Sequence, residues 1–478
     1  MQRWHTLASL LIMACWLTAC ASTPAPQPEL GLEVAEAWSS ETTPGAVVTG
    51  PWWQSFDDAD LDRVVEEALE HNYDLRAAAA AVESAAAQAR IAGAELEPQI
   101  SAGLDASRRQ QVFVGLPIPG SSGVLQSQSS SYGASLNVSW EPDLWGRLRA
   151  GKAAAAADAR AARADFEAAR LSLAGQVAKA WFTVVEAERQ VRLARDTVES
   201  RQTSTDRITA RYRRGVAGSL DLRLARTNQA EAESAVELRR RQLDVARRQL
   251  EILLGRYPAG RVGDAELALP EVPDPIPVGL PSELVTRRPD LQAAERRLAA
   301  AGLRVQEARR ALYPRLTLTA SGGTTSDSLS DLLDSDFSIW SFAGSLLQPI
   351  FQGGRLRAAV DFAEASRDRA LALYAQSILR ALAEVESALS AERLLAAEEA
   401  AQAAAADESK AAARLAEDRY LAGLGDYLTI LESQRLAFVS ESRLLTVRTL
   451  LLTHRVDLHL ALGGDFEMPD PEQSAGGS

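Results

Sequence analysis

The sequence reads Tyr-Gly-Ala-Ser-Leu-Asn-Val-Ser-Trp at residues 132–140, so that apolar side chains alternate with glycine and small polar residues. This strict period of two predicts a β-strand with one apolar face and one polar face. From Arg147 to Arg214 the chain contains no proline, and apolar residues recur mostly three, four or seven apart, which predicts one helix. At about 1.5 Å per residue, such a helix is roughly 100 Å long, several times the diameter of a small domain.

The same order of patterns occurs twice along the chain. Alternating segments lie at 99–107 and 132–141 in the first half and at 315–322 and 339–347 in the second half. They predict four strands per chain. A second proline-free helical pattern extends from Arg355 to Ala422 in the second half.

Matching landmarks indicate that the two halves are copies of one unit. Asp290 follows Asp74 by 216 residues, and Pro314 follows Pro98 by the same number. Farther along, the offset is 208 residues for four more landmarks: Gly146 to Ala150 with Gly354 to Ala358, Tyr212 with Tyr420, Gly215 with Gly423, and Leu254-Gly255 with Leu462-Gly463. Such self-similarity predicts an internal two-fold repeat.

The repeats are expected at 52–255 and 282–463. Each long helix meets a turn that contains glycine, and a second helical pattern follows, because glycine at such a position typically ends a helix. The predicted fold is therefore mainly α with a small β part. Its main features are two long antiparallel helical hairpins, at about 147–255 and 355–463, whose Ala-rich seams allow helices to pack closely side by side.

The N-terminus resembles a bacterial lipoprotein signal peptide. Arg3 precedes an apolar stretch over 7–17, which is shorter than the roughly 20 residues that span a bilayer. Leu17-Thr18-Ala19-Cys20 then places small residues before a cysteine, so residues 1–19 are expected to be removed and Cys20 to carry acyl chains. The alternative is an ordinary secretory signal that happens to contain a cysteine.

Three segments are expected to lack regular structure. Residues 20–51 would form a lipid-anchored tether, because prolines recur closely after Cys20. Residues 256–281 form a proline-rich connector between the repeats, since proline cannot continue a helix. Residues 464–478 would be a flexible tail.

Composition and motifs argue against nucleic-acid binding and catalysis. Lys and Arg number 51 against 64 Asp and Glu, a net charge of -13, and no cluster of cations suited to phosphates stands out. Gly151-Lys152 is followed by Ala153, so the phosphate-binding loop motif is not completed. His454 and His459 are five residues apart, which does not suit two ligands on one helix face. We therefore expect no enzyme activity, no metal site and no cofactor apart from the lipid on Cys20.

The four predicted strands have a length and pattern that suit an outer-membrane barrel, although a pair of soluble hairpins on a core is the alternative. Four strands cannot close, since such barrels start at about eight, and open edges in lipid would leave backbone groups unpaired. The chain is therefore expected to oligomerise through its sheet. The polar stretches 107–131 and 323–338 would be loops outside the membrane.

Several motifs together resemble the TolC/OprM superfamily, in its branch of NodT-type efflux lipoproteins. The resemblance covers about residues 52–463 and implies a homotrimer with a 12-stranded β-barrel in the outer membrane, continued by an α-barrel through the periplasm. It also implies two partners, a periplasmic adaptor (membrane fusion protein) and an inner-membrane RND-type transporter. The motifs are Leu17 to Cys20, Glu141-Pro142-Asp143-Leu144-Trp145-Gly146-Arg147, Arg288-Pro289-Asp290-Leu291, Gln348-Pro349-Ile350-Phe351-Gln352-Gly353-Gly354-Arg355, and Gly423 to Arg435.

The resemblance also assigns candidate site residues. The hairpin tips are where the family contacts its adaptor, and the corresponding positions here are Gly215, Val216, Ala217, Gly218, Ala422, Gly423, Leu424 and Gly425. Glu432 and Arg435 fall on the acidic and basic positions of the family's gate, with Asp221 and Asp426 as weaker candidates. The alternative for Glu432 and Arg435 is an ordinary surface pair, because charges three apart often pair on a helix.

The implied function is a passive exit duct in the outer membrane, through which a tripartite pump expels small molecules. Metal-ion efflux and type I protein secretion are alternatives that use the same fold. A periplasm-spanning structural lipoprotein would explain the helices but not the strands, and a surface-anchored binding lipoprotein would explain Cys20 but not the hairpins.

Overall fold

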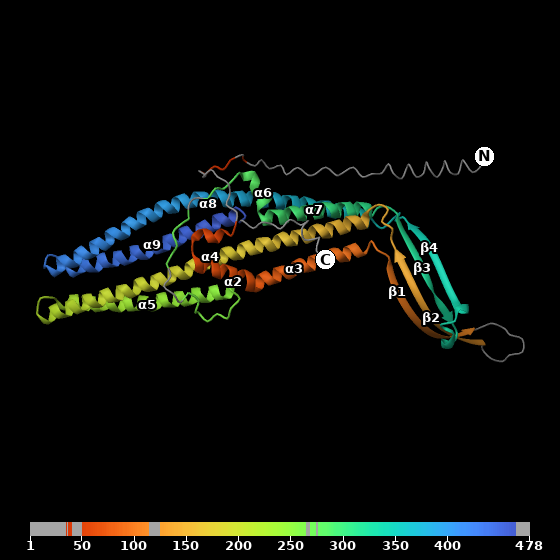
Figure 1. The fold of residues 1–478 in the computed structure, drawn as a ribbon, viewed down its shortest axis with the longest axis horizontal. Coiled ribbons are helices and arrows are strands. Elements are labelled where there is room, and N and C mark those ends of the chain that lie inside the picture. The colour runs from red at the N-terminus through yellow and green to blue at the C-terminus, as the bar shows by residue number, and fades with distance from the viewer. Residues whose placement is uncertain are drawn as a thin grey trace. The chain divides into compact units, whose positions relative to one another are not determined.

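A computed structural model describes residue 35 and residues 37–40, 50–113, 125–263, 268–273 and 276–464 of the chain. All of these residues belong to one compact unit, Val34–Ser478. Within them the fold is mainly helical with a four-stranded sheet (Figure 1). The prediction of a mainly α chain with four strands is confirmed. Cys20 and the predicted signal peptide over 1–19 lie outside the described residues.

In the first half of the chain, three helices precede a β-hairpin, and a long helical hairpin follows it. Asp58 caps α2 by accepting hydrogen bonds from the backbone N–H groups of Asp60 and Leu61, and Asn72 caps α3 in the same way through Leu75. The elements are η1 (Trp52–Phe56), α2 (Ala59–His71), α3 (Tyr73–Ala94), β1 (Gln99–Phe113), β2 (Leu125–Trp140), α4 (Arg147–Arg213) and α5 (Ser219–Leu253).

The second half has the same order of main helices and strands, and its three longest helices match those of the first half in length. The helices α4 and α8 have 67 residues each, α5 and α9 have 35 each, and α3 and α7 have 22 each. The elements are η2 (Pro281–Glu283), α6 (Leu284–Arg287), α7 (Pro289–Arg310), β3 (Arg315–Ser326), η3 (Leu329–Asp331), η4 (Ser335–Phe337), β4 (Ser338–Leu347), α8 (Arg355–Leu421) and α9 (Tyr427–Ala461).

The long helices lie side by side in one layer. Helix α4 packs against α3 and α5, which follow each other along its length, and against α7 and α9. Helix α8 packs against α7 and α9 in turn. The sheet lies beyond the ends of α3 and α7, whereas the turns of the two hairpins lie at the opposite end of the layer (Figure 1). Among the helices described, none combines the length and the apolar character that crossing a membrane requires.

The strands form one antiparallel sheet in the order β1-β2-β3-β4. Ile100 lies opposite Val138, which lies opposite Ala320, which lies opposite Phe342. Because side chains alternate between the faces of a strand, the even-numbered residues share one face, and that face is mainly apolar. The odd-numbered residues share the other face, where Ser, Thr, Gly and Asn predominate. The predicted two-faced sheet is confirmed.

The strands extend farther than the alternation predicted, and the expected loops are correspondingly shorter. Strand β1 continues to Phe113 and β2 begins at Leu125, so much of the predicted loop over 107–131 is a regular hairpin. Residues 114–124 are outside the described part. Polar cross-strand pairs replace apolar ones here: Gln110 and Gln126 are joined at 3.0 Å, and Arg108 donates to Gln128 at 3.2 Å. Similarly, β3 continues to Ser326, so the expected loop over 323–338 begins later.

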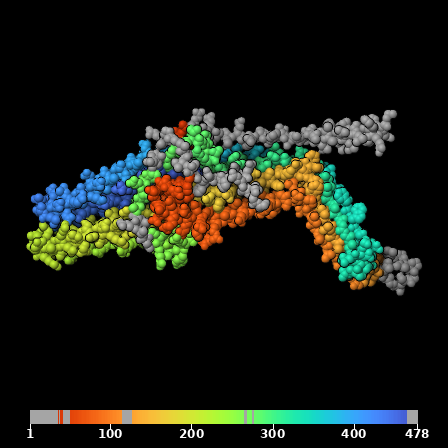
Figure 2. Space-filling model, in the orientation of Figure 1, coloured from red at the N-terminus to blue at the C-terminus, as the bar shows by residue number. Residues whose placement is uncertain are grey.

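The main hydrophobic core lies where η1 and α2 pack against the middle of α4. Trp52, Trp53 and Phe56 are buried there together with Trp181 and Phe182 of α4. In Figure 2 the red segment that includes η1 and α2 covers the centre of the helical layer. The indole N–H of Trp181 donates to Asp58 at 2.8 Å, so the residue that caps α2 also fixes this core.

A short N-terminal segment is held against α8. The backbone N–H groups of Ser39 and Ser40 donate to the two carboxylate oxygens of Glu386 at 2.6 and 3.2 Å. The Trp38 indole donates to the carbonyl oxygen of Gly279 at 2.9 Å. The predicted tether over 20–51 is therefore fastened at 38–40, which a composition rich in proline did not indicate.

Candidate functional site at the hairpin ends

The two hairpin turns have the same backbone geometry. Gly215 and Gly423 have φ values of 77° and 76°, a conformation that residues with a side chain rarely adopt. The following N–H groups, of Val216 and Leu424, donate to carbonyl oxygens five residues back at 3.0 and 2.9 Å, which is the Schellman arrangement. The side chains of Val216 and Leu424 are 61% and 70% exposed. All eight predicted tip residues, 215–218 and 422–425, lie at these turns.

Behind the turns, an apolar cluster joins the two hairpins to each other. We call it the tip cluster, and it takes side chains from α4, α5, α8 and α9. Its members are Ile208, Leu222, Ala225, Ala416, Tyr420, Tyr427 and Ile430. The rings of Tyr420 and Tyr427 lie 5.7 Å apart. The two hairpins of one chain are therefore attached near their ends by buried surface.

Polar contacts reinforce the tip cluster. The hydroxyl of Tyr420 on α8 donates to Asp221 on α5 at 3.5 Å, a long hydrogen bond. The guanidinium of Arg211 on α4 lies over the Tyr420 ring, 5.0 Å from its centroid. Arg207 and Glu417 form an ion pair between α4 and α8. Burial and the neighbouring Asp221 raise the pKa of Tyr420, which keeps its hydroxyl protonated and able to donate.

Asp221 and Asp426, the weaker gate candidates, have different surroundings. Asp426 is the N-cap of α9, where its Oδ1 accepts from the backbone N–H of Thr429 at 2.7 Å and from the Thr429 hydroxyl at 2.9 Å. These bonds lower the pKa of Asp426. Asp221 lies in the first turn of α5 and accepts from Tyr420. Asp426 therefore shapes the start of its own helix, whereas Asp221 links the two hairpins.

Glu432 and Arg435 pair with each other on the exposed side of α9. Arg435 donates from Nη2 to Oε1 at 2.6 Å and from Nε to Oε2 at 3.0 Å, and the side chains are 65% and 63% exposed. The hydrogen bond from Arg435 lowers the pKa of Glu432. Among the described residues, neither side chain contacts another helix through a hydrogen bond or ion pair. Within one chain the pair is thus the surface pair that its spacing predicts.

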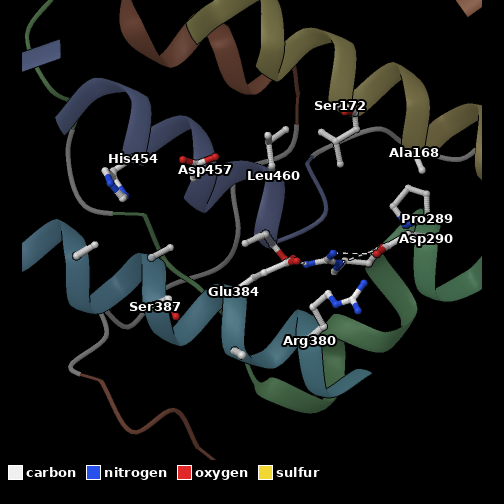
Figure 3. A pocket seen from close by; sticks show the side chains of 16 residues that line it. Ala168, Ser172, Pro289, Asp290, Arg380, Glu384, Ser387, His454, Asp457 and Leu460 are labelled. Atoms are coloured by element: carbon white, nitrogen blue, oxygen red, sulfur yellow. Dashed lines mark hydrogen bonds and ion pairs between the residues drawn. The ribbon is translucent and has the colours of Figure 1, made fainter. Parts of the chain in front are cut away.

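Arg288 is a further charged residue whose role the sequence pattern did not indicate. It precedes α7 and donates to both oxygens of Asp290, to Glu384 of α8 at 2.6 Å and to the Ala461 carbonyl of α9 at 3.2 Å (Figure 3). Burial acts to lower the pKa of Arg288, but its bonds to the two carboxylates outweigh burial and raise it. Pro289 and Asp290 lie in the first turn of α7, where they begin the helix, and Arg288 in addition joins α7 to α8 and α9.

Arg288 lies on the wall of a cavity of about 850 Å³ between α4, α7, α8 and α9. Arg380, Glu384, His454 and Asp457 also line it (Figure 3). His459, the second histidine considered in the sequence, is instead buried beneath Trp52, with ring centroids 5.2 Å apart. In the described part of the chain, no group of three or more His, Cys, Asp or Glu is placed to hold a metal ion.

Residues 64–256 and 280–464 match the family described as Outer membrane efflux protein. The chain belongs to this family. The two matched ranges each contain one β-hairpin and one long helical hairpin.

Relatives and solved structures of this family resemble the chain over almost its whole length. The chain is 35% identical over 471 residues to the pyoverdine export outer membrane protein OpmQ of Pseudomonas putida, covering 97% of this chain and 98% of that protein. It is 37% identical to the outer membrane protein OprJ of Pseudomonas aeruginosa, covering 96% of each. The outer membrane channel CmeC of Campylobacter jejuni superimposes with a TM-score of 0.84 and 26% identity, over 95% of this chain and 97% of that one.

The predicted membership in the TolC/OprM superfamily is confirmed, and so is the predicted function. The chain is an outer-membrane efflux protein, and outer-membrane efflux channels share its fold. Its place is the outer membrane.

Proposed function

We propose that three copies of this chain form one duct, in which twelve strands close a barrel in the outer membrane. The observation that carries this proposal is a sheet with two open edges and one lipid-compatible face. Strands β1 and β4 are each paired on one side only. Leu104 on β1 and Trp340 on β4 are both 83% exposed on the apolar face. Pairing β1 of one copy with β4 of the next satisfies both edges, which lipid requires.

The helices support the same arrangement. The equal lengths of α4 and α8, and of α5 and α9, support an internal two-fold repeat, so that three copies contribute six similar hairpins. Helix α8 borders the layer on one side, and α3 and α5 border it on the other. Joining these borders between neighbouring copies would close the layer into an α-barrel that continues the β-barrel.

The hairpin ends would serve as the periplasmic gate and as the docking surface for partners. In a trimer, Glu432 and Arg435 occur three times around the axis, where each can pair within its own chain or with a neighbour. The exposed Val216 and Leu424 offer apolar contacts at the tips. We propose that the tips receive a periplasmic adaptor, which connects the duct to an inner-membrane RND-type transporter.

The cargo would be small organic molecules. The relatives include proteins named for export of pyoverdine and for efflux of toluene. Substrate choice and energy would come from the transporter, because a duct of this kind only conducts. Metal ions and secreted proteins are the alternative cargoes for this fold.

A lipid on Cys20 would hold the N-terminus at the membrane. Farther along the chain, Ser39 and Ser40 bind Glu386 and so attach this N-terminal segment to α8. The test is metabolic labelling with a radioactive fatty acid. The wild-type protein is expected to incorporate the label and the Cys20→Ser variant to lose it. Equal labelling of both proteins would contradict lipidation at this residue.

Disulfide cross-linking between the open edges tests the trimer. A cysteine at Ser101 on the polar face of β1 is combined, one at a time, with cysteines at 339–346 of β4. Oxidation is expected to give cross-linked dimers and trimers with odd-numbered β4 positions and not with even-numbered ones, because only odd positions share the polar face. The Ser101→Cys variant alone is the control. No cross-linked trimer at any β4 position would contradict the proposal.

A further inference from the structure

The polar face of the sheet carries a single carboxylate, at Asp105 in the middle of β1. In the register of the sheet, Asp105 lies opposite Gly133, which lies opposite Thr325. The neighbouring rows of the same face are uncharged. Toward the turn between β1 and β2, the next row is Ser107 with Ser131. In the opposite direction the first row is Gly103, Ser135, Gly323 and Ile339, the second is Ser101, Asn137, Ser321 and Ser341, and the third is Gln99, Ser139, Thr319 and Ala343.

The partner strand leaves room for this carboxylate. A methyl group added at Gly133 would lie 2.6 Å from Oδ1 of Asp105, closer than real Cβ atoms come to any neighbour. The Asp105 side chain therefore lies across β2 in the space that glycine provides, and it is exposed. Thr325, beyond Gly133, approaches Ser131 at 3.5 Å between hydroxyl oxygens, so the surroundings of Asp105 are polar but neutral.

No cation neutralises Asp105 among the described residues. Arg109 shares its face but lies four residues along β1, about 13 Å away at roughly 3.3 Å per residue. No hydrogen bond or ion pair joins Arg109 to Asp105, and the uncharged pair of Ser107 and Ser131 lies between their rows. Arg108 lies on the opposite face, where it donates to Gln128. Arg315 shares the polar face but lies ten residues before Thr325 on β3.

We propose that Asp105 sets the charge preference of the β-barrel. This inference rests on the proposed trimer, in which the apolar face contacts lipid and the polar face lines the lumen. Three Asp105 carboxylates then form one ring in an otherwise uncharged section of the duct. A ring of carboxylates that lines a water-filled passage attracts cations and repels anions. The barrel therefore favours cationic organic molecules over anionic ones of equal size.

The test measures ion selectivity of the purified full-length protein in planar bilayers under a KCl gradient. The wild-type channel is expected to prefer K⁺, and Asp105→Asn is expected to lower the ratio of K⁺ to Cl⁻ permeability by about twofold or more. A second variant, Asp105→Asn with Ser135→Asp, returns a carboxylate to the same face one row away and is expected to restore the ratio. Each variant is also recorded together with Glu432→Ala and Arg435→Ala, so that the tip does not mask the barrel.

Charged thiol reagents provide an independent test, because they change the charge at position 105 in either direction. Cys15 and Cys20 are the natural cysteines of the chain, so Asp105→Cys supplies a defined thiol. A positively charged thiol reagent is expected to lower the permeability ratio, and a negatively charged one to raise it. A thiol that does not react would place residue 105 outside the lumen and overturn the inference.

The outcomes separate the two proposals. A conducting protein whose permeability ratio does not change on Asp105→Asn substitution, with the tip pair either intact or replaced, overturns the role of Asp105 and leaves the duct intact. A wild-type protein that never conducts contradicts the proposed duct itself.

Discussion

Arg288, which precedes α7, donates a hydrogen bond at 3.2 Å to the backbone carbonyl oxygen of Ala461, at the end of α9. The first half of the chain contains the equivalent bond. Asn72 precedes α3 and donates to the carbonyl oxygen of Leu253, at the end of α5, at 2.9 Å. In each half, the residue before a 22-residue helix is thus bonded to the end of the helical hairpin. The donor is an amide in the first half and a guanidinium in the second. Only the guanidinium also reaches α8, through Glu384.

Replacing Arg288 by methionine should destabilise the protein by about 1–3 kcal/mol per chain, because the buried carbonyl of Ala461 loses its hydrogen-bond donor and Glu384, whose side chain is 45% exposed, loses its ion pair. Thermal unfolding of the purified protein measures this change. Arg287→Met is the matched control, since Arg287 is exposed and its ion pair within the described part of the chain is with Glu283, one turn away. Similar unfolding midpoints for the two variants would contradict the anchoring role of Arg288.

Loosening the tip cluster should ease opening of the duct. Tyr420→Phe removes the hydroxyl that donates to Asp221 but keeps the buried ring. We expect a higher mean single-channel conductance in planar bilayers. Tyr212→Phe is the control, because Tyr212 occupies the equivalent position of the first hairpin and is 43% exposed. If Tyr212→Phe raises conductance as much as Tyr420→Phe, the link between the hairpins is not what holds the tip.

Glu432 and Arg435 should restrict conduction when three copies surround the axis. The double variant Glu432→Ala and Arg435→Ala is expected to raise single-channel conductance, because it removes charged side chains that crowd the tip. Glu237 and Arg240 on α5 form another exposed pair with the same spacing, at 2.6 Å, and serve as the control. Unchanged conductance in the Glu432 and Arg435 variant would leave this pair as an ordinary surface contact.

His459 should make the protein sensitive to acid. Burial, with a contribution from Arg455, lowers the pKa of His459 to about 3. In the unfolded chain the imidazole has its ordinary pKa of 6.5 and binds a proton as the pH falls below that value, whereas in the folded protein it stays neutral until about pH 3. Protonation therefore favours the unfolded state, so the free energy of unfolding is highest above pH 6.5 and decreases as the pH falls toward 3. The loss reaches about 5 kcal/mol per chain at most.

Thermal unfolding between pH 7 and pH 4 measures this sensitivity. His459→Phe keeps an aromatic ring against Trp52 and should flatten the pH dependence. His454→Gln, in the neighbouring cavity, should retain the dependence of the wild type. A His459→Phe protein that loses stability in acid as steeply as the wild type would assign the sensitivity to other groups.

Much of the fold could be predicted because its elements are long and regular. The helix at Arg147–Arg213 has no proline over its whole length, and its apolar residues recur mostly three, four or seven apart. The alternation at 132–140 correctly assigned each side chain to one face of the sheet. The outer parts of β1 and β2 could not be predicted, because polar pairs such as Gln110 with Gln126 leave no apolar period there.

The candidate site could be located but its contacts could not be predicted. Glycines at 215 and 423 mark the hairpin ends in the sequence, since the turns require their positive φ values. The role of Tyr420 depends on how α8 lies against α4 and α5, which no local pattern encodes. Tyr212 and Tyr420 match in the sequence, yet one is exposed and the other is buried in the tip cluster.

Single-particle electron microscopy of the purified full-length protein in mild detergent shows directly whether three copies close one barrel. We expect particles with three-fold symmetry, in which β1 of each chain pairs with β4 of its neighbour. Stable particles that contain a single chain with a free β4 edge, or a closed ring with another number of chains, would contradict it.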